Sequence, residues 1–199
     1  MFAHPHLFLL GRGLIRPSDP NLRLASLSAE EIEITSDFTS PAEEAVGFVA
    51  AAFDVHLDDT QRAAFVERER TYCIAKVPYY DIDSDYVALP KGRGVICLAG
   101  SDGGVLSSIL EPVISQLKDA GRSVWHWERD SGLLPADIYL RHCLLAVKKA
   151  GRVAEASFLE ETFLADRRTS LAAYLERDDN MKRVMMAVPP EDLMERFNG

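Results

Sequence analysis

Five consecutive residues in the middle of the chain have a pattern that could bind an anion: Gly100-Ser101-Asp102-Gly103-Gly104. Glycines let backbone N–H groups approach a negatively charged group, and a helix that begins there adds a favourable dipole. The segment has neither the Gly-Lys-Ser/Thr ending of a Walker loop nor Gly-x-Gly-x-x-Gly spacing. Two interpretations stay open. Gly100, Ser101, Gly103 and Gly104 form a ligand-binding loop, or the segment is a tight turn capped by Ser101 or Asp102.

A second group of charged residues, Glu128, Arg129 and Asp130, follows the next apolar run. If both runs are parallel strands of one sheet, these side chains emerge at the same edge as Ser101 and Asp102, where ligands bind on such sheets. Asp102 or Glu128 would then be placed to accept or donate a proton. The alternative is a charged turn exposed to solvent.

Three alternating aspartates, Asp81, Asp83 and Asp85, are similar to the start of a calcium-binding loop. Such a loop needs a glycine at its sixth position and a bidentate glutamate at its twelfth. Here Tyr86 and Gly92 occupy these positions. The segment therefore indicates a solvated loop, and no metal ligand is predicted.

The three cysteines are Cys73, Cys97 and Cys143, far apart and each within an apolar run. An odd number at such spacing predicts free, buried thiols. No Cys-x-x-Cys pair or Cys/His pairing indicates a zinc site.

Composition narrows the class of protein. Of the 199 residues, 47% are hydrophobic and 27% charged, which is typical of a globular chain. The net charge of −9 disfavours nucleic acid or an anionic membrane as the main partner. No stretch of about 18 apolar residues predicts a membrane span, and the apolar start of the chain lacks a basic leader. We expect a cytoplasmic location and an acidic surface that suits solubility or a basic protein partner.

From Val95 onward, apolar runs alternate with helical patterns. Strand and helix alternating in this way predict right-handed crossovers and a parallel sheet with helices on both faces. The expected strands are 95–99, 123–127 and 183–188. One expected helix ends near Ala120, and two others cover 135–149 and 159–176. Residues 152–157 fit either a strand or a helix. Residues 91–199 are therefore expected to form a three-layer, Rossmann-like α/β unit.

Residues 1–90 are expected to form an α+β subregion, separate from the main sheet or integrated with it. The pattern predicts strands at 7–10, 31–35 and 72–77, and helices from Ser40 and from Asp58 or Asp59 to about Arg70. Pro78, Pro90 and the glycines up to position 94 indicate a loop or an irregular hairpin at the boundary.

Part of this pattern, within 93–190, resembles the early core of an α/β-hydrolase. Residues 95–104 are similar to that family's strand and oxyanion loop, 110–121 to its following helix, and 124–132 to its next strand and turn. The resemblance implies that Ser157 is the nucleophile. Ser157 lacks the two glycines of Gly-x-Ser-x-Gly, and no histidine follows it, so the family's Ser–acid–His order is absent.

The same stretch resembles, more loosely, the TIR and nucleoside-deoxyribosyltransferase groups. The shared features are the first strand, the acidic Asp102, a helix ending in Ala-Gly, and Val124-Trp125. This resemblance implies that a glutamate near Glu160 or Glu161 is the catalytic acid on a ribosyl bond.

Together these features predict a protein that binds a small polar or anionic ligand at the carboxyl ends of parallel strands. It would be a hydrolase or transferase acting on an ester or glycosidic bond. The alternative is a non-catalytic, regulatory protein that binds a protein partner or forms a homo-oligomer. The sequence leaves open whether the protein is an enzyme and which cofactor it uses. The candidate catalytic residues are Asp102, Glu128, Ser157 and Glu160.

Overall fold

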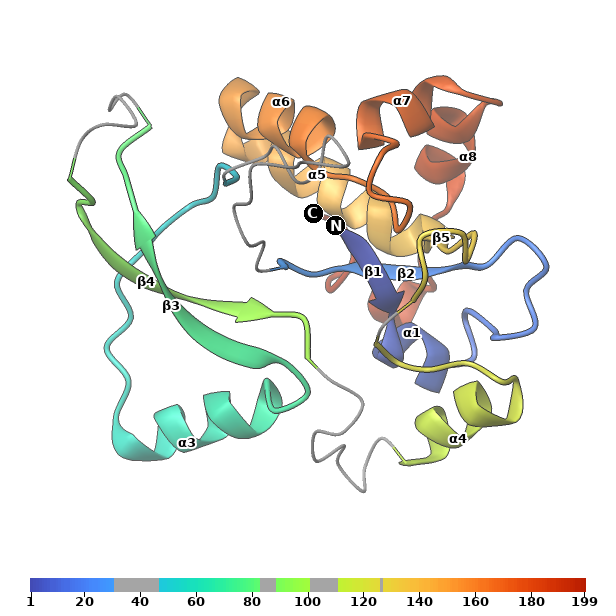
Figure 1. Cartoon of the computed structure of the whole chain (residues 1–199), viewed down its shortest axis with the longest axis horizontal. Helices are drawn as coiled ribbons and strands as arrows, with labels where there is room; N and C mark the ends of the chain where they lie inside the picture. Colours follow the sequence, from blue (N-terminus) through green and yellow to red (C-terminus); the bar gives the residue numbers. More distant parts are fainter. Residues whose placement is uncertain (31–46, 83–88, 101–110, 126) are drawn as a thin grey trace.

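The computed structural model describes residues 1–30, 47–82, 89–100, 111–125 and 127–199 (Figure 1). Within these ranges it contains two small β-sheets and seven α-helices. In the view of Figure 1, the two-stranded sheet and α3 lie on the left, and the three-stranded sheet lies on the right beside the C-terminal helices.

The three-stranded sheet joins the N-terminal residues to the middle of the chain. Its strands are β1 (Phe2–Pro5), β2 (Arg23–Leu27) and β5 (Leu134–Pro135), in the order β1-β2-β5. β1 pairs with β2 antiparallel, and β2 pairs with β5 parallel. The inner strand β2 has three buried residues in the middle of its five, which anchors the sheet in the core.

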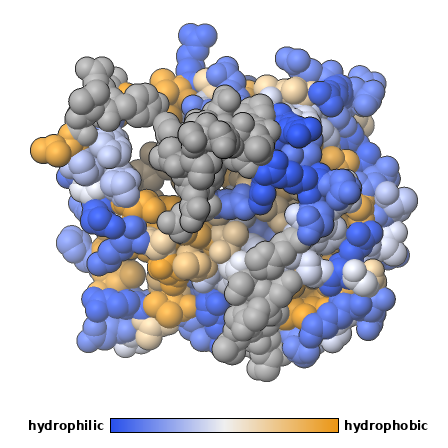
Figure 2. Space-filling model, in the orientation of Figure 1, coloured by the Kyte–Doolittle hydropathy of each residue, from blue (hydrophilic) through white to orange (hydrophobic). Residues whose placement is uncertain are grey.

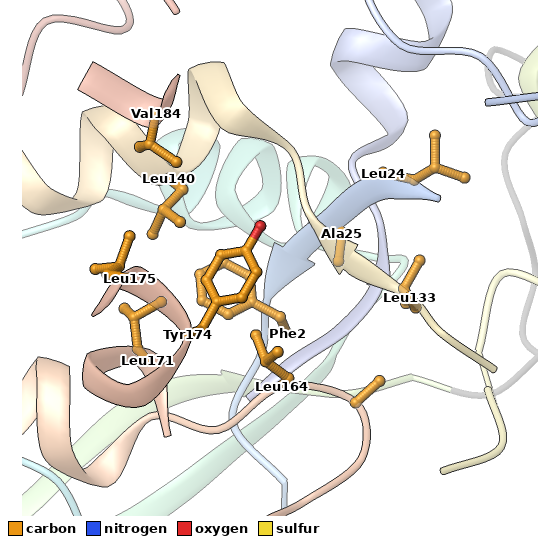
Figure 3. Close-up of a cluster of buried hydrophobic side chains, with 11 residues drawn as sticks. Phe2, Leu24, Ala25, Leu133, Leu140, Leu164, Leu171, Tyr174, Leu175 and Val184 are labelled. Carbon is orange, nitrogen blue, oxygen red and sulfur yellow. The ribbon is translucent and has the colours of Figure 1, made fainter. Parts of the chain in front are cut away.

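The C-terminal third of the chain is helical and packs against this sheet. Its elements are α5 (Asp137–Ala150), α6 (Arg152–Glu161), α7 (Leu171–Glu176), α8 (Asn180–Met186) and a 3-10 turn (Glu191–Leu193). Figure 3 shows the largest buried cluster, in which side chains of the sheet meet those of α5, α7 and α8. The cluster includes Phe2, Leu24, Leu140, Leu171, Tyr174, Leu175 and Val184. Burial of this apolar surface is the main term that holds the helices on the sheet.

A second buried cluster lies between α1 (Leu7–Gly11) and α4 (Glu111–Asp119). It contains Leu10, Val113, Ile114, Leu117 and Trp125. Gly121 follows α4 with a φ of 67°, as the sequence predicts for a left-handed residue after that helix.

The remaining elements form what we call the arm: α3 (Asp59–Arg68), β3 (Cys73–Tyr79) and β4 (Gly92–Leu98). The two strands form an antiparallel hairpin. Asp58 begins α3 with a capping box that includes Gln61. None of the described residues between 47 and 100 is buried, so α3 has no face packed into a core. Cys73 is exposed, and the prediction that it is buried is wrong.

The expected three-layer, mostly parallel Rossmann-like sheet is wrong. The apolar run from Val95 belongs to β4, which pairs with its sequence neighbour β3 instead of entering a parallel sheet. Residues 183–188 fall largely in α8, and 7–10 lie in α1. Val124 and Trp125 are buried without forming a strand. A short apolar run marks burial equally well in a helix, a strand or a loop, because periodicity alone does not separate them.

The predicted helices of the C-terminal third agree in part with the helices of the structure. The helix expected at 135–149 is confirmed as α5, and residues 152–157 are helical in α6. The long helix expected at 159–176 is divided into α6 and α7 by residues 162–170. The expected strand at 31–35 and the start of the Ser40 helix lie outside the described residues. None of the described helices has both the length and the apolar character needed to cross a bilayer.

Candidate functional site

A cleft with a volume of about 430 Å³ opens where β2 and β5 meet the loops around α7 and α8. This size is within the range of small-molecule sites, roughly 300–1,000 Å³. Three arginines stand on its wall in a chain whose net charge is −9. The lining residues are Arg23, Leu134, Leu164, Asp166, Thr169, Tyr174, Arg177, Asp178, Asn180 and Arg183.

Three separate segments bring these residues together. β2 supplies Arg23, which is in register with Leu134 of β5. The loop before α7 supplies Asp166 and Thr169. The turn between α7 and α8 supplies Arg177. Convergence of side chains from distant parts of the chain is typical of a binding site.

Backbone strain surrounds the cleft. The non-glycine residues with positive φ in the described ranges are Leu22 (49°), Arg167 (59°), Asp178 (49°) and Asp179 (56°). Leu22 precedes Arg23, Arg167 lies between Asp166 and Thr169, and Asp178 itself lines the cleft. Such conformations cost free energy and cluster at functional sites. All three segments that build the cleft carry one.

Arg183 is held in place by its neighbours. Its Nε and Nη2 donate to Asp137 at 3.0 and 3.2 Å, Nη2 also donates to the Tyr174 hydroxyl at 2.8 Å, and Nη1 donates to Asn180. Burial alone would lower the pKa of this guanidinium, but Asp137 and Tyr174 outweigh burial and raise it. Arg183 is therefore a fixed part of the wall, with its charge balanced by Asp137.

Arg23 and Arg177, unlike Arg183, have no acidic partner within the described ranges. The Nε atom of Arg23 is buried and has no hydrogen-bond acceptor among the residues that the structure describes. A buried donor without an acceptor is costly, and an unpaired guanidinium beside a cleft favours an anionic ligand there.

Tyr174 adds a further donor. Its hydroxyl oxygen accepts the bond from Arg183, and no acceptor for its own proton lies among the described residues. Burial raises the pKa of Tyr174. The charge of Arg183 lowers this pKa and the charge of Asp137 raises it, and the net shift is upward. The hydroxyl is therefore protonated at neutral pH and can donate to a ligand.

Two carboxylates complete the wall. Asp166 accepts bonds from the backbone N–H groups of Arg168 and Thr169, both at 2.9 Å, and from the Thr169 hydroxyl at 2.6 Å. Burial raises the pKa of Asp166, but these bonds outweigh it and lower the pKa. Asp178 is exposed and makes no ion pair within the described part of the chain.

The anion loop predicted from the sequence lies mostly outside the described residues, because only Gly100 of residues 100–104 is described. A Cβ atom at position 100 would lie 2.3 Å from the carbonyl oxygen of Thr71, so a close backbone approach requires glycine there. The roles of Asp102, Ser101, Gly103 and Gly104 stay predictions.

The other predicted site residues are placed apart from the cleft. Glu128 and Asp130 are exposed in a turn. Ser157 is buried in α6, where it donates a hydrogen bond to Glu161 and accepts one from the Val49 N–H at 3.0 Å. Glu160, also in α6, is exposed. Catalysis by Glu128, Ser157 or Glu160 stays a prediction.

No sequence pattern predicts the cleft, because Arg23 lies more than 150 positions before Arg177 and Arg183 and the three arginines form no motif. The run Arg177-Asp178-Asp179-Asn180 is the one local signal, since adjacent charged and amide residues favour turns with left-handed conformations. Within the described ranges, no group of three or more His, Cys, Asp or Glu side chains is arranged to hold a metal ion.

Comparison with known proteins assigns no family to the chain. No protein-family model, no curated protein and no solved structure matches it.

Proposed function

We propose that the protein binds a small molecule with an anionic group in the cleft lined by Arg23, Arg177 and Arg183. The observation that carries the proposal is the convergence of three arginines on one cleft, two of which, Arg23 and Arg177, have no ion-pair partner among the described residues. Arg177 and the hydroxyl of Tyr174 add donors on the same wall. Guanidinium groups bind carboxylate and phosphate oxygens through charge-assisted, often bidentate hydrogen bonds.

The expected affinity follows from these donors. A hydrogen bond to a charged group contributes about 1.5–3 kcal/mol, and a tenfold change in affinity corresponds to about 1.4 kcal/mol. Loss of the Arg23 guanidinium is therefore expected to weaken binding by roughly 10- to 150-fold. The uncharged part of the ligand can pack on Leu134 and Leu164, which also line the cleft.

A thermal-shift titration tests the proposal. Inorganic phosphate and isovalerate are the anionic probes, L-leucine is a zwitterion that carries the same kind of carboxylate, and isovaleramide and isopentanol are uncharged controls of similar shape. A ligand at a hundredfold excess over its dissociation constant adds about 2.7 kcal/mol to stability. For a chain of this length, that corresponds to a rise in Tm of roughly 5–10 °C. Anionic probes that act no differently from the uncharged ones would refute the proposal.

A matched pair of variants locates the site. Arg23→Gln removes the cleft guanidinium, whereas Arg141→Gln removes another guanidinium whose Nε is also buried without an acceptor but does not line the cleft. We expect Arg23→Gln alone to abolish the shift produced by the anion. Equal loss in both variants would indicate that folding, rather than the cleft, controls the response.

A second candidate function, self-association, is favoured by the arm. None of the described residues of the arm is buried. Since an isolated two-stranded sheet is only marginally stable, contact with another surface would stabilise the arm. In Figure 2, hydrophobic residues are exposed on the left of the view, where the arm lies. The exposed large apolar residues of the arm include Val66, Tyr79 and Val95, and Phe53, Tyr80 and Leu89 are exposed in the segments next to it.

We propose a second copy of the chain as the partner of the arm, since closed homo-oligomers are the commonest assemblies of soluble proteins. Light scattering coupled to size exclusion measures the mass in solution. A dimer that dissociates in the Val95→Lys variant, with Val153→Lys in α6 as an equally exposed control, supports the proposal. A monomer at all concentrations contradicts it.

A further inference from the structure

The cleft carries both signs of charge. Arg23 and Arg177 face no ion-pair partner among the described residues, and Asp178 and Asp166 lie on the same wall. Asp166 already accepts three hydrogen bonds, so its oxygens are largely occupied. Asp178 takes part in no hydrogen bond between described side chains and is the carboxylate left for a ligand.

The charges of the site balance. Arg183 is paired with Asp137, which leaves two arginines, Arg23 and Arg177, and two carboxylates, Asp166 and Asp178. A ligand that carries only negative charge would be attracted by the arginines and repelled by the carboxylates. A ligand with one anionic and one cationic group satisfies both and leaves the net charge unchanged.

One part of the wall is apolar. Leu134 and Leu164 line the cleft, and Leu164 is buried, with 6% of its surface exposed. Apolar surface beside a few convergent polar groups is the usual composition of a small-molecule site. The ligand therefore combines two opposite charges with an apolar portion.

We propose that the ligand is an α-amino acid with an apolar side chain. Its carboxylate accepts hydrogen bonds from Arg23 and Arg177, its ammonium group lies against Asp178, and its side chain packs on Leu134 and Leu164. This inference rests on the proposed anion-binding function and specifies its ligand class.

Isothermal titration with four probes tests the inference. L-Leucine has both charges; N-acetyl-L-leucine lacks the ammonium group; L-leucinamide lacks the carboxylate; inorganic phosphate is an anion without an apolar part. We expect L-leucine to bind, and removal of either charged group to raise the Kd at least about tenfold.

Two neighbouring aspartates provide a matched control. Asp178 and Asp179 are adjacent, exposed and both in a left-handed conformation, but only Asp178 lines the cleft. Asparagine tolerates this conformation, so either substitution leaves the turn intact. Asp178→Asn is expected to raise the Kd for L-leucine up to about fivefold, on the scale of an exposed charge pair. Asp179→Asn is expected to leave it unchanged.

The outcomes separate this inference from the proposed function. Equal affinity for L-leucine and N-acetyl-L-leucine, or binding of phosphate without L-leucine, would overturn the amino-acid assignment and leave anion binding in place. Equal effects of Asp178→Asn and Asp179→Asn would also overturn it. No binding of any of the four probes would overturn both.

Discussion

Arg183 of α8 and Asp137 of α5 form a two-point ion pair, with Nε–Oδ2 at 3.0 Å and Nη2–Oδ1 at 3.2 Å. The two side chains are 28% and 19% exposed, so water screens the pair only partly. The pair joins the first and last of the C-terminal helices α5 to α8. It also fixes one wall of the cleft, because Arg183 donates to Tyr174 as well.

Asp137→Asn is expected to lower the free energy of unfolding by about 1–3 kcal/mol, because it leaves a half-buried guanidinium without its counter-charge. Urea denaturation followed by circular dichroism measures this change. The control is Asp59→Asn, whose partner Arg62 lies 3.5 Å away on exposed α3. An exposed pair contributes little, so equal effects of the two substitutions would contradict the role given to Asp137.

Leu140→Ala is expected to lower the free energy of unfolding by about 2–5 kcal/mol, because Leu140 is fully buried in the main cluster and truncation leaves a cavity. Val66→Ala on α3, where the side chain is 51% exposed, is expected to change it by less than about 0.5 kcal/mol. Urea denaturation of both variants compares them. A loss at Val66 as large as that at Leu140 would show that the arm has a packed core of its own.

The buried His4 and the half-buried His6 are expected to make the protein sensitive to mild acid. Burial lowers the pKa of His4 and of His6 to about 4 each, below the ordinary value of 6.5. Since the unfolded chain binds protons more readily, stability is fully present above pH 6.5 and is lost as the pH falls toward 4. By pH 5 the loss is about 2 kcal/mol for each histidine.

Unfolding free energies measured between pH 7.5 and 5 test this dependence, in a range where most carboxylates remain ionised. The exposed His56 is the control, and His56→Gln is expected to leave the curve unchanged. A stability that stays constant over this range would contradict the burial of His4 and His6.

Ser157→Ala is expected to release the backbone at Val49. The Ser157 hydroxyl accepts the Val49 N–H bond at 3.0 Å, and alanine has no acceptor. Hydrogen exchange of the Val49 amide should therefore accelerate, with a loss of about 1 kcal/mol in stability. Unchanged exchange at Val49 would show that Ser157 does not hold this segment.

Local signals in the sequence account for several elements of the fold. The Asp58 cap with Gln61 predicts the start of α3, and two lysines followed by Gly151 predict the end of α5. These elements depend on residues a few positions apart. Local chemistry is therefore enough to place them.

The sheet arrangement depended on contacts that no local pattern reveals. The run from Val95 is equally compatible with a parallel strand and with the hairpin partner of β3 that it turns out to be. The pairing of β2 with β5 joins residues more than 100 positions apart. The cleft depends on the same long-range contact, because Arg23 reaches it through β2. Its residues could not be found without the fold.

The central claim is that the guanidinium group of Arg23 binds the anionic group of the ligand. The most direct measurement is the Nε–H signal of Arg23 in a ¹H–¹⁵N correlation spectrum, assigned with the Arg23→Gln variant, during titration with L-leucine and with inorganic phosphate. A saturable shift of this signal with at least one of the two, while the Nε–H of Arg141 stays in place, is the result that the account predicts. A signal that does not move with either ligand would contradict it.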